Sequence, residues 1–492
     1  MGNEELGIKN YCIRYAVTLL CLTSLNAEST QEILEGFDDE PVEIKKKSID
    51  LEKSSDLMDG FDDETVKAEE NSVNEMDGFS EETPSDTFDD NNVSEVTDEK
   101  SSIIEGLTGK LTQEIAYSYN GGRPHDKFTA FKSSLFLDYE HKFENGWRLK
   151  TNAKAYYDAI YDKRDERYTQ DVLDEERSEI ELFDAYIEGS ITDSLDVKFG
   201  RQVVVWGRSD TIRITDVLNP LDNRRPGMVD IEDLRLPIAM AKFDFFFGDW
   251  RVTPIAILEQ RHSKNPAFGS AFNAMQNPHI EEESYNDITY ALSVGGEFSG
   301  WDVNFYAARI YDDAGYVKFN PQPKFTHDKV NMFGTALNVL SGSWLFKAEL
   351  AYFDGLNFTA TQNENFKRTD ILLGAEYKGI ADTLISYDLS LRHFNNYDER
   401  LLNERNPLEE NTYQHAFRVS SDFMNATLTA NYLISLFGKK LDEGGFQRAW
   451  VKYELGEGIN TNFGVVDYIG GSTLFDSVRD NDMLFVDIAY SF

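Results

Sequence analysis

From about residue 110 to the end of the chain, apolar and polar side chains alternate with a period of two. In the segment from Trp147 to Asp158, one set of alternate positions is apolar or small, whereas the other set carries Arg148, Lys150 and Lys154. This period is typical of a β-strand with one apolar and one polar face. About 18 segments of this kind follow one another: 111–119, 129–143, 147–160, 178–191, 194–206, 236–247, 249–260, 287–298, 301–311, 329–340, 344–354, 369–378, 382–394, 412–423, 426–437, 445–455, 459–468 and 483–492.

The connections between these segments are alternately short and long. The short ones are rich in Gly, Asn, Asp and Ser, as tight hairpin turns require, and the long ones reach almost 30 residues. Short turns on one side and long loops on the other are typical of a transmembrane β-barrel rather than a soluble sandwich. The fold class is therefore all-β, a transmembrane antiparallel β-barrel of about 18 strands (16–18). An even strand count places both chain ends on the periplasmic side of a Gram-negative outer membrane, and the terminal aromatic Phe492 resembles the assembly signal of outer-membrane proteins.

Composition agrees with a barrel and excludes a helical membrane protein. The mean hydropathy is −0.48, and no run of 18 apolar residues occurs. A strand that alternates through lipid has a hydrophilic average, so this value does not argue against a barrel. The net charge of −40 argues against nucleic acid as a partner.

The first 27 residues have the form of a secretory signal peptide. Lys9 and Arg14 precede a short apolar run, and Ala27 offers a cleavage point. A buried N-terminal helix is the alternative. The two cysteines, Cys12 and Cys21, both lie in this segment, which excludes cysteine-based zinc, iron–sulfur and nucleophile sites downstream.

Residues 28–105 form an acidic segment with 27 Asp/Glu against 6 Lys/Arg. Such a composition predicts disorder, and we expect the barrel to occupy residues 106–492. Within the segment an aliphatic–acidic–Gly–Phe motif recurs around Phe37, Phe61 and Phe79. Repeated short motifs of this kind suit a periplasmic protein or an inner-membrane exporter as partner, although drift in a solvated tail gives the same pattern.

One long connection differs from the others in its chemistry. Between about residues 207 and 235 arginines and carboxylates are interleaved with apolar residues and prolines, which suits a loop folded into the barrel lumen. Two interpretations remain open, an ion-pair lattice that only anchors the loop and a constriction that selects solutes. The candidate pore residues are Arg208, Asp210, Arg213, Asp216, Asp222, Arg224, Arg225, Glu232, Asp233 and Arg235.

The runs GRQVVVWGRSD, DVLNPLD and IEDLRLP at 200–237, followed by Phe247-Gly248-Asp249-Trp250, carry a resemblance. The chain resembles an uncharacterised family of porin-like outer-membrane β-barrels whose members accompany RND-superfamily exporters of the MMPL type. The likeness covers about residues 110–492 and leaves out the acidic repeats. It implies a barrel that takes part in envelope transport and supplies no catalytic residues.

We expect a channel rather than an enzyme. None of the seven histidines lies in a local nucleophile or zinc signature, and we assign no catalytic residue, metal or cofactor. The predicted function is a channel or transport component that passes small solutes or lipid-like cargo with a periplasmic or inner-membrane exporter partner. The alternative is a non-conducting outer-membrane anchor or assembly scaffold that acts through its acidic tail and external loops.

Overall fold

The computed structural model describes residues 105–120, 127–163 and 165–492. The predicted signal peptide and almost all of the acidic segment, with the motifs at Phe37, Phe61 and Phe79, lie outside the described residues. In the described part of the chain, no helix has the length and apolar character needed to cross a membrane.

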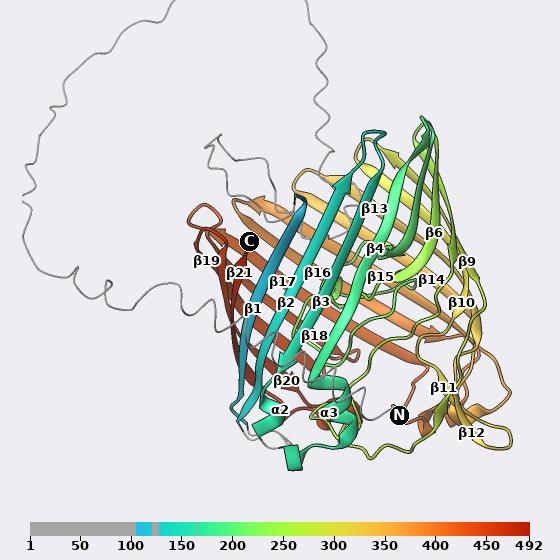
Figure 1. Cartoon of the computed structure of the whole chain (residues 1–492). Coiled ribbons are helices and arrows are strands. Elements are labelled where there is room, and N and C mark those ends of the chain that lie inside the picture. Colours follow the sequence, from blue (N-terminus) through green and yellow to red (C-terminus); the bar gives the residue numbers. More distant parts are fainter. Residues whose placement is uncertain (1–104, 121–126, 164) are drawn as a thin grey trace, which may run out of the picture. The chain divides into compact units, whose positions relative to one another are not determined.

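Eighteen antiparallel strands form one closed barrel (Figure 1). Each strand pairs with its neighbours along the chain, and β1 closes the ring by pairing with β21, as at Lys110 and Ser491. This confirms the barrel and the number of strands that the alternation predicts. The strands are β1 (Leu107–Ser118), β2 (Phe128–Lys142), β3 (Arg148–Asp158), β4 (Ser178–Thr192), β5 (Leu195–Gln202), β6 (Ile238–Phe247), β7 (Trp250–Ile257), β9 (Thr289–Phe298), β10 (Trp301–Tyr311), β13 (Lys329–Ser341), β14 (Trp344–Leu356), β15 (Phe366–Ile380), β16 (Thr383–Phe394), β17 (Asn411–Phe423), β18 (Leu428–Phe437), β19 (Gly445–Gly456), β20 (Ile459–Ile469) and β21 (Met483–Ser491).

The short turns all lie at one rim of the barrel and the long loops at the other (Figure 1). The first and last strands meet at the short-turn rim, where the backbones of Gly109 and Phe492 exchange hydrogen bonds of 2.9 Å. At the opposite rim the loops form a small sheet of β8 (Glu281–Glu282), β11 (Tyr316–Phe319) and β12 (Pro323–Thr326). They also carry the short helices α2 (Ile160–Lys163), α3 (Gln170–Glu176) and α5 (Thr473–Asp476).

The outer face of the barrel is apolar and the inner face is mixed. In β21, Leu484, Val486 and Ile488 are exposed on the outside, whereas the alternate residues Met483 and Phe485 are buried inside. Charged residues of the strands point inward and pair there; Lys150 lies 3.5 Å from Asp138, and Lys347 contacts Glu376. The outer surface is therefore suited to lipid and the lumen to polar contacts, which is the phase that the sequence predicts.

Strand β5 is shorter than its sequence pattern predicts. The alternation extends over 194–206, but the strand ends at Gln202, and Val203 to Trp206 leave the wall and enter the lumen. Gly200 has a positive φ of +128°, and a Cβ atom there would lie 2.2 Å from the carbonyl oxygen of Ala185. The hydrophobic period continues beyond the strand because these residues are buried in the lumen instead of facing lipid.

A charge on the outer face should destabilise the barrel. Leu373 on β15 has an exposed fraction of 59% and faces outward near the middle of its strand. We predict that Leu373→Arg lowers the free energy of unfolding in lipid vesicles, measured by urea titration, by about 2–4 kcal/mol, the usual cost of a basic side chain at mid-bilayer.

The matched control is Leu402→Arg in the 3-10 helix Glu399–Asn403 of an external loop, where the native side chain is 46% exposed. Equal loss of stability in both variants would contradict the assignment of the outer face to lipid.

Candidate functional site: the lumen and its inward loop

The inward loop, residues 203–237, connects β5 to β6 through the lumen. Its two ends are joined by Asn219, whose side chain accepts a hydrogen bond from the Val204 amide at 2.8 Å and donates to the carbonyls of Gln202 and Leu236. Asn219 is 2% exposed, so these contacts replace the hydrogen bonds that its amide would make with water. The loop therefore begins and ends at one buried side-chain amide.

Glu349 of β14 anchors the middle of the loop to the barrel wall. One carboxylate oxygen accepts hydrogen bonds from the amides of Arg208 (2.7 Å) and Ser209 (3.0 Å). The other accepts from the amide and the hydroxyl of Thr215, at 3.2 and 2.7 Å. Gly207 makes room for this contact, because a Cβ atom at its φ of +94° would lie 2.9 Å from the carboxylate. Four donors thus satisfy a carboxylate that is almost completely buried.

Two further wall carboxylates hold the same stretch. Asp388 of β16 accepts hydrogen bonds from the hydroxyls of Ser209 (2.7 Å) and Thr211 (2.6 Å). Asp302 of β10 pairs with the guanidinium of Arg208 at 2.5 Å. Acidic residues of the wall, rather than acidic residues of the loop, therefore provide most of its anchoring.

A second set of contacts lies within the loop itself. One oxygen of Asp216 accepts from Arg213 at 3.1 Å and from Arg235 at 2.9 Å, and the other accepts from the amide of Trp206 at 3.3 Å. Charge-assisted pairs that share a buried carboxylate are strong when every donor is in place. Arg213, Asp216 and Arg235 thus stabilise the fold of the loop.

The loop packs against one side of the lumen through apolar side chains. Trp206 stacks on Tyr306 of β10 with the ring centroids 4.6 Å apart, and Ile212, Ile214 and Leu218 are buried in the same cluster. The cluster extends over inward residues of the wall between β6 and β17. This side of the lumen is therefore filled, unlike the polar lumen expected of an open porin.

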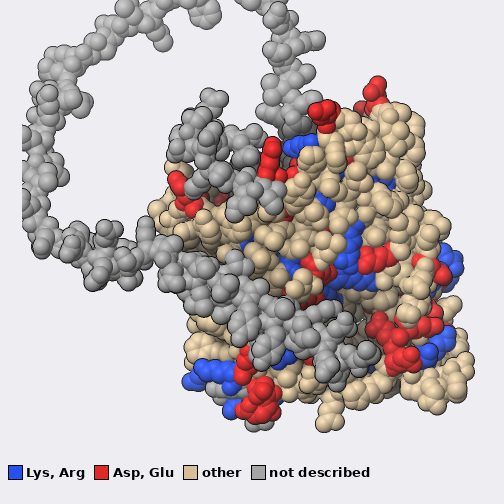
Figure 2. Space-filling view, viewed as in Figure 1, with Lys and Arg blue, Asp and Glu red and all other residues tan. Residues whose placement is uncertain are grey.

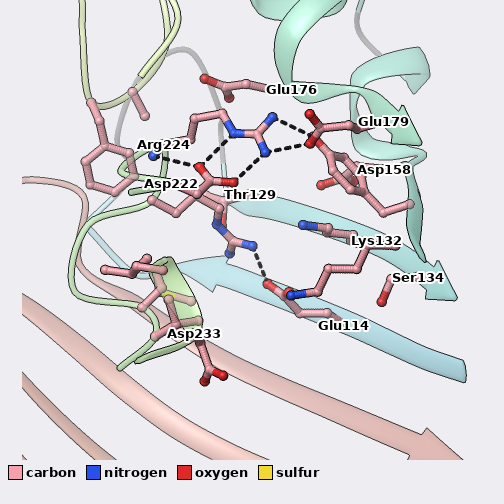
Figure 3. A pocket seen from close by; sticks show the side chains of 18 of the residues that line it. Glu114, Thr129, Lys132, Ser134, Asp158, Glu176, Glu179, Asp222, Arg224 and Asp233 are labelled. Carbon is pink, nitrogen blue, oxygen red and sulfur yellow. Dashed lines mark hydrogen bonds and ion pairs between the residues drawn. The ribbon is translucent and has the colours of Figure 1, made fainter. Parts of the chain in front are cut away.

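On the opposite side the loop leaves a cavity of about 300 Å³ against β1–β4 (Figure 3). Arg224 lies between Asp222 (2.5 Å) and Glu179 of β4 (2.7 Å), and Arg225 pairs with Glu114 of β1 at 2.7 Å. Asp233, from the short helix α4 (Ile231–Leu234), borders the same space.

Electrostatics in this region follow from burial and pairing. Burial alone would raise the pKa of Asp222, but the hydrogen bonds from Arg224 outweigh it and hold that pKa below its usual range. Burial lowers the pKa of Arg225, whereas the Glu114 carboxylate raises it, and the net direction is upward. Both pairs are therefore fully charged at neutral pH.

The cavity combines apolar and charged lining residues. Phe183, Met228, Leu236, Phe272 and Met483 provide apolar surface. The acidic residues of its lining include Glu114, Asp158, Glu176, Glu179, Glu181 and Asp222, and each of these six already accepts a hydrogen bond or ion pair from the protein.

The loop also meets the far wall through Asp230, which sequence analysis did not select. Arg418 of β17 and Arg448 of β19 both contact its carboxylate, the first at 3.4 Å. The guanidinium of Arg448 lies 3.7 Å from the ring centroid of Trp450. Asp230 is therefore the acceptor that balances two basic residues inside the barrel.

The ten candidate pore residues thus fall into several groups along the inward loop. Asp222, Arg224, Arg225 and Asp233 border the cavity. Asp210 is exposed and lies 3.5 Å from Lys347, and Glu232 is exposed on α4. Enclosure in the lumen, with Asp233, Asp230 and Asp210 nearby, raises the pKa of Glu232.

The residues that the sequence interpretation missed are mainly on the wall. Glu349, Asp388 and Asp302 lie on inward strand positions, where the period-two pattern marks them only as polar. Apart from the Arg208 guanidinium on Asp302, their partners in the loop are backbone amides and hydroxyls, which leave no charge pattern in the sequence. In the sequence, only the alternation of polar positions along the strands indicates that these carboxylates face the lumen.

Among the described residues, one group of possible metal ligands lies in the loops of the long-loop rim. His262, Glu282 and His327 bring their ligand atoms within 4.8 Å of one another. The two imidazole rings are stacked at a centroid distance of 3.4 Å and an angle of 8°, so their in-plane lone pairs do not converge on one point. Burial and the neighbouring His327 lower the pKa of His262 to about 4, which keeps this stacked ring neutral at pH 7. We therefore describe the group as a histidine stack.

Comparison with known proteins adds a family and a set of similar barrels. The model of a family described as "Protein of unknown function (DUF1302)" matches residues 96–492, and no curated protein matches the chain. OccAB3 of Acinetobacter baumannii is 10% identical over 79% of this chain and 100% of its own, with a TM-score of 0.47. OccK8 (OprE) of Pseudomonas aeruginosa is 10% identical over 80% and 99%, with a TM-score of 0.45. The outer membrane channel DcaP of Acinetobacter baumannii is 9% identical over 78% and 96%, with a TM-score of 0.41. Because these barrels are only 9–10% identical to this chain and their TM-scores lie below 0.5, we assign no residue of this chain a role from them.

Loss of the Glu349 carboxylate should release the inward loop. Glu349→Gln replaces one acceptor oxygen by an NH2 group and leaves buried donors of Arg208 or Thr215 unpaired, at about 1–3 kcal/mol for each orphaned group. We predict a lower free energy of unfolding and faster tryptic cleavage after Arg208 and Arg213, measured on protein in vesicles.

Glu457→Gln in the short turn between β19 and β20 is the control, because Glu457 is exposed there and lies outside the loop contacts. A Glu349→Gln protein that resists trypsin as well as the control does would show that the loop does not depend on this contact.

Proposed function

We propose that this chain, which belongs to the family described as protein of unknown function (DUF1302), is an outer-membrane channel whose lumen is divided by a fixed inward loop. A closed barrel with an apolar outer face satisfies every backbone group of its strands in lipid. The observation that supports a channel is the position of the loop. Hydrogen bonds to Glu349 hold it against one side of the wall, and a cavity remains on the other side against β1–β4.

The orientation follows from the two rims. We infer that the short turns and both ends of the barrel face the periplasm, because short turns lie on that side in outer-membrane barrels. The acidic segment 28–105 would then extend into the periplasm. There its repeated motifs would meet a periplasmic protein or an MMPL-type exporter.

The cavity lining indicates the kind of cargo. Apolar surface from Phe183 and Phe272 lies beside fixed charges such as Arg225, which suits a molecule with both apolar and charged parts better than a simple ion. The arginines and carboxylates of the loop are paired with each other or with the wall, so they hold the loop in place. The loop and the barrel wall together then form the boundary of the proposed pathway. The proposed function is thus the passage of small amphiphilic or lipid-like molecules.

A change of lumen charge should alter ion selectivity. Asp230→Asn leaves Arg418 and Arg448 without their carboxylate partner, so the lumen gains positive charge. In planar bilayers under a KCl gradient we predict that the reversal potential moves toward that of an anion-selective pore, while the Glu457→Gln control in a short turn keeps the value of the unaltered protein.

Absence of any conductance would contradict an open channel. The scaffold alternative makes a different prediction: deletion of 28–105 would abolish function in cells, whereas charge changes in the lumen would leave it intact.

A further inference from the structure

The edge of β4 is unpaired over half of its length on the side that faces β5. Strand β4 pairs with β3 from Ser178 to Glu188, but it pairs with β5 only from Ala185 to Thr192. Residues 178–184 therefore have a strand on one side only. Among the described residues, no backbone–backbone hydrogen bond joins this edge to another segment. The barrel wall consequently has a gap between β4 and the chain that follows β5.

Charged side chains, not backbone, span this gap. Arg201, at the end of β5, donates to the carbonyl oxygen of Leu182 at 2.5 Å and forms a two-pronged ion pair with Glu259 at 2.7 and 3.0 Å. Behind it, Arg261 contacts Glu181, and Lys264 contacts Glu179 and, at 2.6 Å, Glu181. Figure 2 shows basic and acidic side chains gathered at mid-height on the face where β4 lies.

The gap lies at the level of the outer part of the membrane. The eight residues of β5 rise about 19 Å above the short-turn rim, and residues 178–184 add about 16 Å, for a rise of 3.3 Å per residue and a tilt of 45°. Because the apolar band of such barrels is about 25 Å tall, the gap begins inside it. On both of its sides the outward residues are apolar and exposed, as shown by Ile180, Leu182 and Phe199.

The cavity described above lies directly behind this edge. Glu179, Glu181 and Phe183 of the unpaired stretch belong to its lining. A β-bulge at Phe183 and Asp184 interrupts the pairing of β4 with β3 and brings Phe183 to the cavity. Lipid outside and cavity inside are therefore separated at this level by side chains of the gap alone.

Two lysines of the cavity carry charge that no described carboxylate neutralises at ion-pair distance. The ammonium of Lys132 lies 3.9 Å from the ring centroid of Tyr156, and that of Lys154 lies 4.8 Å from that of Phe183. Asp158 and Glu176 of the same lining accept hydrogen bonds only from neutral donors, which leave their charge in place. The cavity therefore carries charges of both signs beside apolar surface.

We propose that the gap between β4 and the end of β5 is a side portal through which a single-chain amphiphile passes between the outer leaflet and the cavity. Arg201 closes the portal, because its guanidinium donates to the carbonyl oxygen of Leu182 on the unpaired edge and is held in place by its ion pair with Glu259. In the cavity Phe183 and Phe272 contact the apolar chain of the amphiphile, and the charged lining residues contact its head group. This inference rests on the proposed channel function and names its substrate class and its route.

The test asks whether acyl chains reach the cavity from the membrane. In a background with Cys12 and Cys21 replaced by serine, a fluorophore is attached to Ser134→Cys, which faces the cavity on β2. Ser133→Cys on the outer face of the same strand reports full contact with lipid, and Ser420→Cys on β17 reports a lumen wall remote from the cavity. Each protein is placed in vesicles of phosphatidylcholine with brominated acyl chains, which quench on contact.

We expect the Ser134 label to be quenched more than the Ser420 label and less than the Ser133 label. In Arg201→Ala we expect quenching of the Ser134 label to increase several-fold. The matched control is Arg309→Ala, an exposed arginine of β10 that is far from the gap in sequence and sheet order. Quenching of the Ser134 label that equals the Ser420 label in both backgrounds would overturn the portal. If Ser134→Cys does not fold, Lys154→Cys, which is exposed in the cavity, takes its place.

Single-channel conductance of the same preparations separates the two proposals. Conductance without lipid quenching supports the channel function and refutes the portal. Lipid quenching without conductance supports the portal and contradicts an open channel.

Discussion

The buried carboxylate of Glu349 is the contact on which the arrangement of the lumen depends. A charge removed from water is tolerated only when hydrogen bonds replace its hydration, and the amides of Arg208, Ser209 and Thr215 supply them. Because these amides belong to one loop and the carboxylate to the wall, the loop has one position that satisfies both. The position of the loop then decides which side of the lumen is filled and which side stays hollow.

Strand β5 ends early, at Gln202, and this has two consequences for the structure. The residues that leave the wall after Gln202 become the inward loop, and the edge of β4 that they would have paired becomes a gap. Gly200 makes this departure possible through its close approach to Ala185. Loop, cavity and gap therefore occur together, because all three follow from a strand that ends before it has crossed the membrane.

Most charges of the loop are used to hold it in place. Arg213, Asp216 and Arg235 form one buried cluster, and Arg224 and Arg225 are paired with carboxylates of the loop and the wall. These contacts are those of an ion-pair lattice, which is one of the two interpretations of the loop that sequence analysis left open. Selection of solutes by a constriction stays a prediction.

The sequence by itself determined the barrel, a number of strands of about 18, its short turns and the polar face of strands such as 147–158. These features depend on local chemistry, namely a period of two and the turn residues between strands, and a one-residue slip would place Lys150 or Arg448 in lipid. Only the tertiary structure decided where β5 ends, which carboxylate holds the loop and where the cavity lies. Those features depend on which amides, carboxylates and apolar residues meet across the lumen, often more than 100 residues apart, and the period of a strand contains no record of such partners.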